Sequence, residues 1–131
     1  LFFDPTGKMP AGDHKGIAQQ IDIMPTLLGY LGYDKPYIAF GQDLLHTDPD
    51  DMWAFNWDHI PQFIKNKYLL QSDNETITGI YNYRSDPLLK KNLKGELPEE
   101  KAMERQMKAI IQSFMERMEA DSVTISTKMN Q

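Results

Sequence analysis

Hydrophobic and polar residues alternate in the middle of the chain with the period of two that is typical of β-strands. The alternation is clearest in MWAFNWDHI (52–60), where Trp53, Phe55 and Trp57 fall on one face. The segments FIKNKYLLQSD (63–73) and TITGIYNYR (76–84) are predicted as two further strands. Because the connections between the three segments are short, the pattern predicts an antiparallel meander.

A second pattern, with the period of a helix, occupies the C-terminal part of the chain. Apolar residues recur there at spacings of three and four, at Met103, Met107, Ile110, Ile111, Phe114 and Met118. They follow Pro98, Glu99 and Glu100, and acidic residues are favourable in the first turn of a helix. We therefore predict a helix that runs from these residues to about Ala120 and covers one face of the sheet.

The N-terminal part of the chain is mostly irregular and contains one short predicted helix. Asp22 is a typical N-cap, and Pro25 is tolerated in a first helical turn. Ile23, Leu27, Leu28 and Leu31 fall on one helical face, and Gly32 is a typical C-terminal stop. The sequence predicts a helix from about Ile23 to Leu31.

These elements predict an α+β fold in two parts. Residues 1–45 contain a strand, a loop and the short helix. Residues 46–131 form a small antiparallel sheet of three to four strands packed by the long C-terminal helix. Leu1–Phe3 reads as a short buried strand, ended by the turn residues Asp4–Gly7. A chain that begins inside a strand is typical of a piece of a larger protein.

Composition narrows the classes of function. The chain has 131 residues, enough for one domain with a real core. Its 19 acidic and 14 basic residues give a net charge of −5, so we expect no nucleic-acid partner and no membrane contact by this segment. It has no cysteine, which excludes disulfides, thiolate metal sites and a cysteine nucleophile.

Asp13 and His14 are the first candidates for chemistry, because an Asp–His pair can supply metal ligands in an ester-cleaving enzyme. No hydrophobic strand precedes the pair to hold it rigidly. A hydrolytic metal site needs several protein ligands, and His46 and His59 show no ligand spacing with His14. We predict a solvated turn, keep His14 as a weak binding candidate, and predict no catalytic or metal-binding residue in this chain.

Two groups of acidic residues have simpler explanations than catalysis. Asp22 could be called a catalytic acid, but its position before the predicted helix is fully explained by the role of an N-cap. The HTDPDD segment (46–51) contains Asp48, Asp50 and Asp51, but it lacks the glycine and the closing glutamate of a calcium loop. We predict that this segment is a solvated loop.

The aromatic strand supplies the remaining binding candidates. Trp53, Phe55 and Trp57 could stack on a sugar or contact a protein, although aromatic residues at this spacing more often pack one face of a sheet. His59, at the end of the same strand, could line a cleft. The alternative hypothesis for the chain is therefore a self-standing sugar- or protein-binding module.

Two segments resemble a known enzyme family. The segment QQIDIMPTLLGYLGYDKPYIAFGQDLL (19–45) resembles sulfatases and lipoteichoic-acid synthases in its D-x-x-P-T-L-L-x-x-x-G and G-x-(S/D)-L-L patterns, matched by Asp22, Pro25, Thr26, Leu27, Leu28, Gly32, Gly41, Asp43, Leu44 and Leu45. The segment KYLLQSDNETITGIYNYRSDPLLKKNL (67–93) is similar to the C-terminal hairpin of the same family, at Lys67, Tyr68, Leu70, Tyr81, Asn82, Asp86, Pro87, Asn92 and Leu93.

The resemblance covers residues 1 to about 93. It looks closer to phosphoglycerol transferases of the lipoteichoic-acid synthase type, because Asp86-Pro87 is followed by Leu88-Leu89 where sulfatases more often have Gly-Glu. It implies a fragment of an alkaline-phosphatase-like α/β fold, with residues 1–45 as the tail of the main α/β core. A metal-dependent parent that acts on sulfate or phosphate esters is implied as well. It also implies that the parent is a membrane-anchored bacterial protein with this part in an extracytoplasmic domain.

The resemblance places the catalytic groups outside this chain. The nucleophile, a threonine or a formylglycine, and the ligands of a divalent metal (Mn, Mg, Zn or Ca) would lie upstream of Leu1. The chain alone is then inactive, and its partner is the missing N-terminal part of the same enzyme. We expect such a fragment to expose apolar side chains, and to form a homodimer or swap a segment to cover them, at Ile17, Ile21, Ile23, Leu27 and Leu31.

Overall fold

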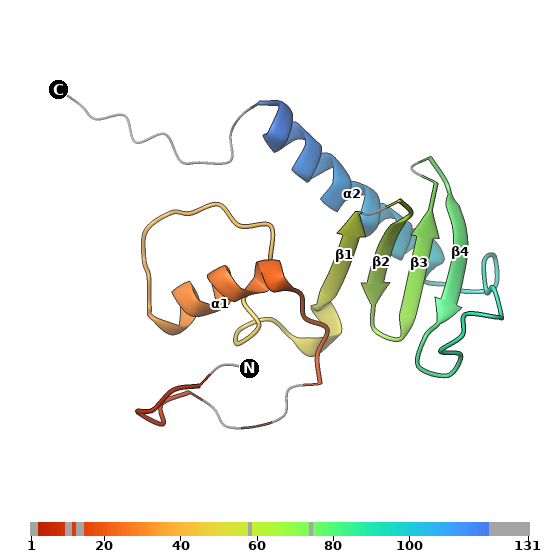
Figure 1. Cartoon of the computed structure of the whole chain (residues 1–131). Helices are drawn as coiled ribbons and strands as arrows, with labels where there is room; N and C mark the ends of the chain where they lie inside the picture. The colour runs from red at the N-terminus through yellow and green to blue at the C-terminus, as the bar shows by residue number, and fades with distance from the viewer. Residues whose placement is uncertain (1–2, 10–11, 13–14, 58, 74, 121–131) are drawn as a thin grey trace.

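The computed structural model describes residues 3–9, 12, 15–57, 59–73 and 75–120, and shows a sheet covered by one long helix (Figure 1). Along the chain the elements are the 3-10 turn η1 (Gln20–Asp22), helix α1 (Ile23–Tyr30), the 3-10 turn η2 (Pro49–Asp51), strands β1 (Trp53–Trp57), β2 (Pro61–Lys65), β3 (Tyr68–Ser72) and β4 (Ile77–Asn82), and helix α2 (Glu100–Glu119). The predicted α+β fold class is confirmed.

The sheet is an antiparallel meander in the order β1-β2-β3-β4. The predicted single strand over 63–73 is wrong, because a hairpin turn at Asn66-Lys67 divides it into β2 and β3. Lys65 pairs with Tyr68 across that turn. Asn66 has a φ of 55°, in the left-handed region that asparagine tolerates better than most residues. The three-residue polar interruption Lys65–Lys67 in the apolar pattern therefore contains a turn and is not a solvent-facing stretch of one strand.

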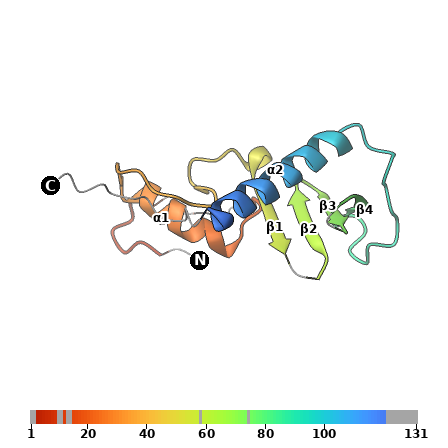
Figure 2. The ribbon, with the colours of Figure 1, turned by 90° about the horizontal axis from the view of Figure 1, so that it is seen from above.

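The core lies between the sheet and the first half of α2. Phe55 pairs with Phe63, Phe63 with Leu70, and Leu70 with Ile80, so these side chains share one face. Helix α2 crosses that face, as the two views show (Figures 1 and 2). The buried cluster consists of Phe63, Tyr68, Leu70, Ile77, Ile80, Met103 and Met107. The predicted role of the α2 stripe is confirmed for this half of the helix.

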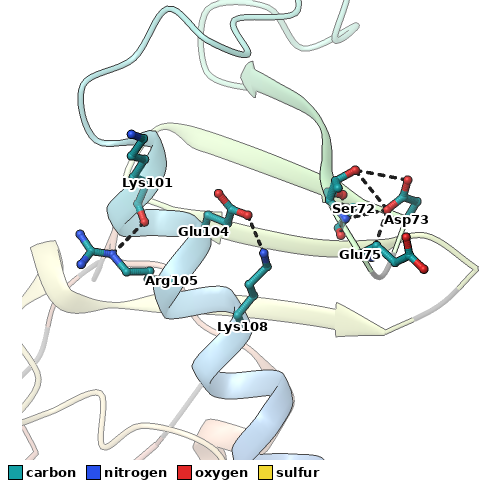
Figure 3. A network of polar contacts seen from close by, with 8 residues as sticks. Ser72, Asp73, Glu75, Lys101, Glu104, Arg105 and Lys108 are labelled. Atoms are coloured by element: carbon teal, nitrogen blue, oxygen red, sulfur yellow. Dashed lines mark hydrogen bonds and ion pairs between the residues drawn. The ribbon is translucent and has the colours of Figure 1, made fainter.

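The second half of α2 extends beyond the sheet. Phe114 packs against Phe40 of the loop after α1, with ring centroids 4.9 Å apart. Met118 is 54% exposed, so the apolar stripe is longer than the surface that covers it. On the polar side of the helix, Glu104 and Lys108 form an ion pair at 2.7 Å (Figure 3). Neither helix in the described part of the chain is long and apolar enough to span a membrane.

Helix α1 ends as the sequence predicts. Gly32 has a φ of 66°, and its N–H donates to the Gly29 carbonyl at 3.1 Å. The next N–H, from Tyr33, donates to the Leu28 carbonyl at 2.9 Å. This pair of hydrogen bonds is the Schellman motif, which satisfies carbonyls that the helix leaves open and favours glycine at the left-handed position.

Helix α1 has its exposed and buried sides reversed from the usual pattern, because large apolar side chains are exposed. The residues that α1 buries are Pro25 and Thr26. Of the four residues of the predicted apolar face, Ile23, Leu27 and Leu31 are 47%, 39% and 73% exposed, and Leu28 is half-buried. The helix is therefore anchored through polar contacts and presents its apolar face to solvent.

The predicted strand at the start of the chain is not supported by the residue that can be assessed. Phe3 is 84% exposed and lies outside any strand, whereas Leu1 and Phe2 lie outside the described residues. The predicted turn that follows is confirmed, because the Gly7 N–H donates to the Asp4 carbonyl at 3.2 Å. A single apolar triplet gives no information about the surface that would bury it, which explains the error at Phe3.

The packing of α2 on the sheet makes Met107 a sensitive position. It is 1% exposed, so Met107→Ala leaves a cavity among the core side chains. We expect the free energy of unfolding to fall by about 2–5 kcal/mol in a urea titration. Met115→Ala is the control, because Met115 is 52% exposed on the same helix and should change stability by less than about 0.5 kcal/mol. Equal effects of the two substitutions would contradict this packing.

Candidate functional site

The aromatic candidates do not form one open platform. Trp53 and Phe55 are half-buried and pack against the core cluster, with the Trp53 ring 6.2 Å from that of Phe63. Trp57 stands edge-on to Phe55 at 5.8 Å and is 45% exposed. His59 is exposed, and His14 and Asp13 lie outside the described residues. Trp57 is thus the ring of this strand that is most accessible to a ligand.

Acidic and histidine side chains do not gather into a metal site in the part of the chain that the structure describes, where no group of three or more potential ligands is found. Asp48, Asp50 and Asp51 are all exposed, as predicted for a solvated loop. The Asp48 side chain accepts the Asp50 N–H at 2.9 Å and caps η2. These carboxylates therefore have a local structural role.

A histidine–carboxylate pair lies in the turn after the α1 loop, where the sequence analysis proposed no site. His46 Nδ1 lies 2.7 Å from Asp43 Oδ2, and the His46 side chain is 67% exposed. The other oxygen of Asp43 accepts the Leu45 N–H at 3.0 Å. Because Asp43 is used to close this turn, the pair has the geometry of a local cap.

Asp22 is the most highly connected buried group in the N-terminal part. It is fully buried, and its carboxylate accepts the N–H of Gln19 and the N–H of Gln42, each at 2.8 Å. The prediction that Asp22 caps α1 is corrected, because its side chain makes no cap hydrogen bond to that helix. The carboxylate instead joins the segment before α1 to the segment after it.

The two glutamines held by Asp22 reach the outer edge of β1. The Gln19 side-chain oxygen accepts the Phe55 N–H at 3.1 Å, and its nitrogen lies 3.5 Å from the Trp53 carbonyl. The Gln42 side-chain oxygen accepts the Trp53 N–H at 3.0 Å, and its nitrogen donates to the Asp51 carbonyl at 3.2 Å. The two amides therefore satisfy edge groups that a neighbouring strand would otherwise pair with.

Thr26 closes the same arrangement from inside α1. Its fully buried hydroxyl donates to the Asp22 carbonyl at 2.6 Å and accepts the Leu44 N–H at 3.0 Å. Gly41 lies so close to Ile21 that an added Cβ would be 2.1 Å from the Ile21 carbonyl oxygen. Only glycine fits this approach, which brings the 41–44 segment against the start of α1.

We call the set formed by Gln19, Asp22, Thr26, Gly41 and Gln42 the Asp22 anchor. Gln19 and Asp22 have the reciprocal hydrogen bonds of a capping box, but Gln-x-x-Asp differs from the usual S/T-x-x-E/Q signature, so the signal for this pair in the sequence is weak. The contacts of Gln19 with β1 span 34 to 36 residues and that of Gln42 spans 11, and no local pattern predicts them.

Asp4 is a second strongly hydrogen-bonded carboxylate. It accepts the hydroxyl of Tyr30 at 2.6 Å and the N–H groups of Thr6 at 2.8 Å, Lys8 at 2.7 Å and Met9 at 3.0 Å. The Tyr30 hydroxyl, and then Thr6, hold the pKa of Asp4 well below its usual value. The same contact raises the pKa of Tyr30. This cluster fixes the 4–9 turn to the C-terminal end of α1.

Two surface hollows are present among the described residues. One, of about 350 Å³, lies on the sheet face opposite α2 and is lined by Gln19, Gln20, Ile21, Ala54, Phe55, Asn56, Gln62 and Ile64. The other, of about 420 Å³, is lined by Lys15, Gly16, Ile17, Pro49, Asp50, Asn66, Lys67, Tyr68, Arg84 and Glu99. The first has no charged side chain, whereas the second carries three cations and two carboxylates.

Comparison with known proteins gives no assignment. No protein-family model matches the chain. No solved structure matches it either.

The Asp22 anchor predicts a large effect of a nearly isosteric substitution. Asp22→Asn replaces one acceptor oxygen with an NH₂ group, so one of the two buried N–H groups loses its partner. We expect a loss of stability of about 1–3 kcal/mol by urea titration and faster hydrogen exchange at the Gln42 amide. Asp34→Asn, in the exposed loop after α1, is the matched control. Unchanged stability in Asp22→Asn would contradict the anchoring role.

The Asp4–Tyr30 contact predicts a defined pH response. Because the folded pKa of Asp4 is depressed, its contribution to stability is present above the ordinary value of 3.8 and is lost as the pH falls toward the folded pKa. The Tyr30 contribution is present below 10.0 and is lost as the pH rises through its raised pKa.

Tyr30→Phe should therefore raise the pKa of Asp4 toward 3.8, as measured by NMR titration of its side-chain carboxyl carbon. Tyr33→Phe removes the same hydroxyl from an exposed neighbouring tyrosine and should leave the pKa of Asp4 unchanged. An equal pKa in the wild type and in Tyr30→Phe would refute the assigned cause.

Proposed function

We propose that this chain is the C-terminal segment of a metal-dependent sulfatase-like hydrolase or phosphoglycerol transferase of the alkaline phosphatase superfamily. In this proposal its role is structural. The nucleophile and the ligands of the divalent metal belong to the preceding part of the parent enzyme, and the segment completes the fold beside them.

The observation that carries the proposal is the exposed apolar surface around α1, which we call the α1 face. Its members are Ile21 at 49%, Ile23 at 47%, Met24 at 46%, Leu27 at 39% and Leu31 at 73% exposed. A contiguous apolar surface of this kind is typical of an interface with another protein or domain. The Asp22 anchor holds α1 firmly on its polar side, so the apolar face is presented outward on a fixed helix.

The contacts of the resemblance segments support the proposal in a second way. Asp22, Thr26 and Gly41, which match the family patterns, are the residues that join the two halves of the 19–45 segment. In the second segment, Asn92 accepts the Ile80 N–H at 3.1 Å and the Leu93 N–H donates to the Ile80 carbonyl at 2.7 Å. These matching residues have specific structural roles, which is consistent with the proposal.

The alternative of a self-standing binding module has less support. Two of its three aromatic residues, Trp53 and Phe55, are engaged with the core cluster, which leaves Trp57 as the exposed ring. We therefore favour the structural role within a larger enzyme.

A direct test compares this chain with the longer polypeptide encoded by the same gene. We expect the longer polypeptide to hydrolyse p-nitrophenyl phosphate or p-nitrophenyl sulfate with added Mn²⁺ or Zn²⁺, and the chain alone to have no turnover. Its preceding sequence should contain a hydrophobic strand ending in Asp-His and an earlier Thr, Ser or Cys nucleophile motif. Absence of these motifs, or turnover by the isolated chain, would refute the proposal.

The α1 face gives a second, structural arm of the test. Leu27→Ser with Leu31→Ser should lower the melting temperature of the longer polypeptide, because these side chains would be buried there. In the isolated chain the same pair should leave the melting temperature nearly unchanged and reduce binding of a hydrophobic dye. Leu88→Ser, at a site that is 72% exposed, is the control and should have no effect in either polypeptide. An unchanged melting temperature of the longer polypeptide carrying both substitutions would contradict the proposed interface.

A further inference from the structure

We propose that the hollow at the β2–β3 turn binds a small oxyanion, a phosphate or sulfate group that is either free or part of an ester. This hollow has a volume of about 420 Å³ and is built from five separate segments of the chain. They are the 15–17 segment, η2, the 66–68 turn, the turn after β4 and the residue before α2. The proposal concerns the isolated chain and does not depend on the reaction of a parent enzyme.

Three cations from three of these segments line the hollow, namely Lys15, Lys67 and Arg84. All three are exposed, and none has an ion pair in the described part of the chain. The chain as a whole has a net charge of −5. A local excess of positive charge on an acidic chain creates a site at which a bound anion is favourable.

The positions of two of these cations are constrained by aromatic rings. The Lys67 ammonium lies 5.4 Å from the centre of the Tyr68 ring, and the Arg84 guanidinium lies 6.0 Å from that of Tyr83. The Tyr83 hydroxyl donates to the Asn66 carbonyl at 2.9 Å. This hydrogen bond fastens the turn after β4 to the β2–β3 turn, so Lys67 and Arg84 are carried by two turns that are held together. The fold therefore already restricts these two side chains, which reduces the conformational entropy that they lose when a ligand binds.

Two carboxylates on the same lining restrict the kind of anion that can bind. Asp50 and Glu99 leave the hollow with a formal net charge of one positive unit, from three cations and two anions. A long polyanion such as a nucleic acid would meet these carboxylates and the overall negative charge of the chain. A single phosphate or sulfate group can instead contact the cations alone, and guanidinium and ammonium groups suit its oxygens.

The test is an NMR titration of the isotopically labelled chain with inorganic phosphate and, separately, with sulfate. Sodium chloride at matched ionic strength is the reference for screening. We expect saturable amide shifts at Gly16, Lys67 and Arg84 with at least one of the two oxyanions. The comparison of the two titrations shows which oxyanion is preferred. Identical shifts in sodium chloride would overturn the proposal.

Charge variants make the test specific to the hollow. Lys67→Gln and Arg84→Gln should each weaken oxyanion binding about tenfold, because each removes a charge-assisted contact. Lys90→Gln and Arg105→Gln are matched controls, since both residues are exposed and outside the lining, and they should leave binding unchanged. Melting curves establish that each variant is folded.

A third variant distinguishes ligand binding from a structural effect. Asp50→Asn removes a negative charge from the hollow, so it should tighten oxyanion binding by about threefold, whereas mere damage to the site would weaken it. Retained affinity in both Lys67→Gln and Arg84→Gln would overturn the proposal. So would weaker binding in a folded Asp50→Asn variant.

Discussion

The hydrogen bonds of the buried Asp22 carboxylate are the constraint on which the N-terminal part of the structure depends. They hold the backbone of Gln19 and the backbone of Gln42 at fixed positions on either side of α1. Each glutamine then uses its side-chain amide to pair with the edge of β1. A carboxylate buried without these partners would be strongly unfavourable, so the loop, the helix and the sheet edge are stabilised as one unit.

This arrangement explains why α1 can be fixed without burying its apolar face. Most short helices are held by apolar packing, but α1 is held by Asp22 and Thr26 on its inner side. The apolar side chains remain available for another surface. The contrast with α2 is clear, because Met103 and Met107 of that helix are buried against the sheet. The chain thus combines a sheet packed by α2 with an N-terminal segment that leaves apolar side chains exposed.

Sequence patterns predicted an element of the fold well where an apolar repeat continued over several helical turns or where a typical capping residue was present. The stripe from Met103 predicted α2, and Gly32 predicted the end of α1. They failed at Asn66-Lys67, because the polar residues of a tight turn inside an apolar pattern look like the solvent-facing residues of one continuous strand. The candidate sites were less predictable. The glutamine contacts and the gathering of cations at one hollow bring together residues from distant segments, and such proximity is a property of the tertiary fold.

The glutamine contacts with β1 also have a consequence for the order of folding. The four strands are neighbours in the chain, and each can pair with the preceding one through a short turn. The Gln19 amide, by contrast, has to find a partner that lies 34 to 36 residues further along. The segment that carries Gln19 precedes β1 in the chain, so the contacts of Gln19 with the strand form only after β1 has been synthesised. We therefore expect the docking of this segment to follow local strand pairing and not to guide it.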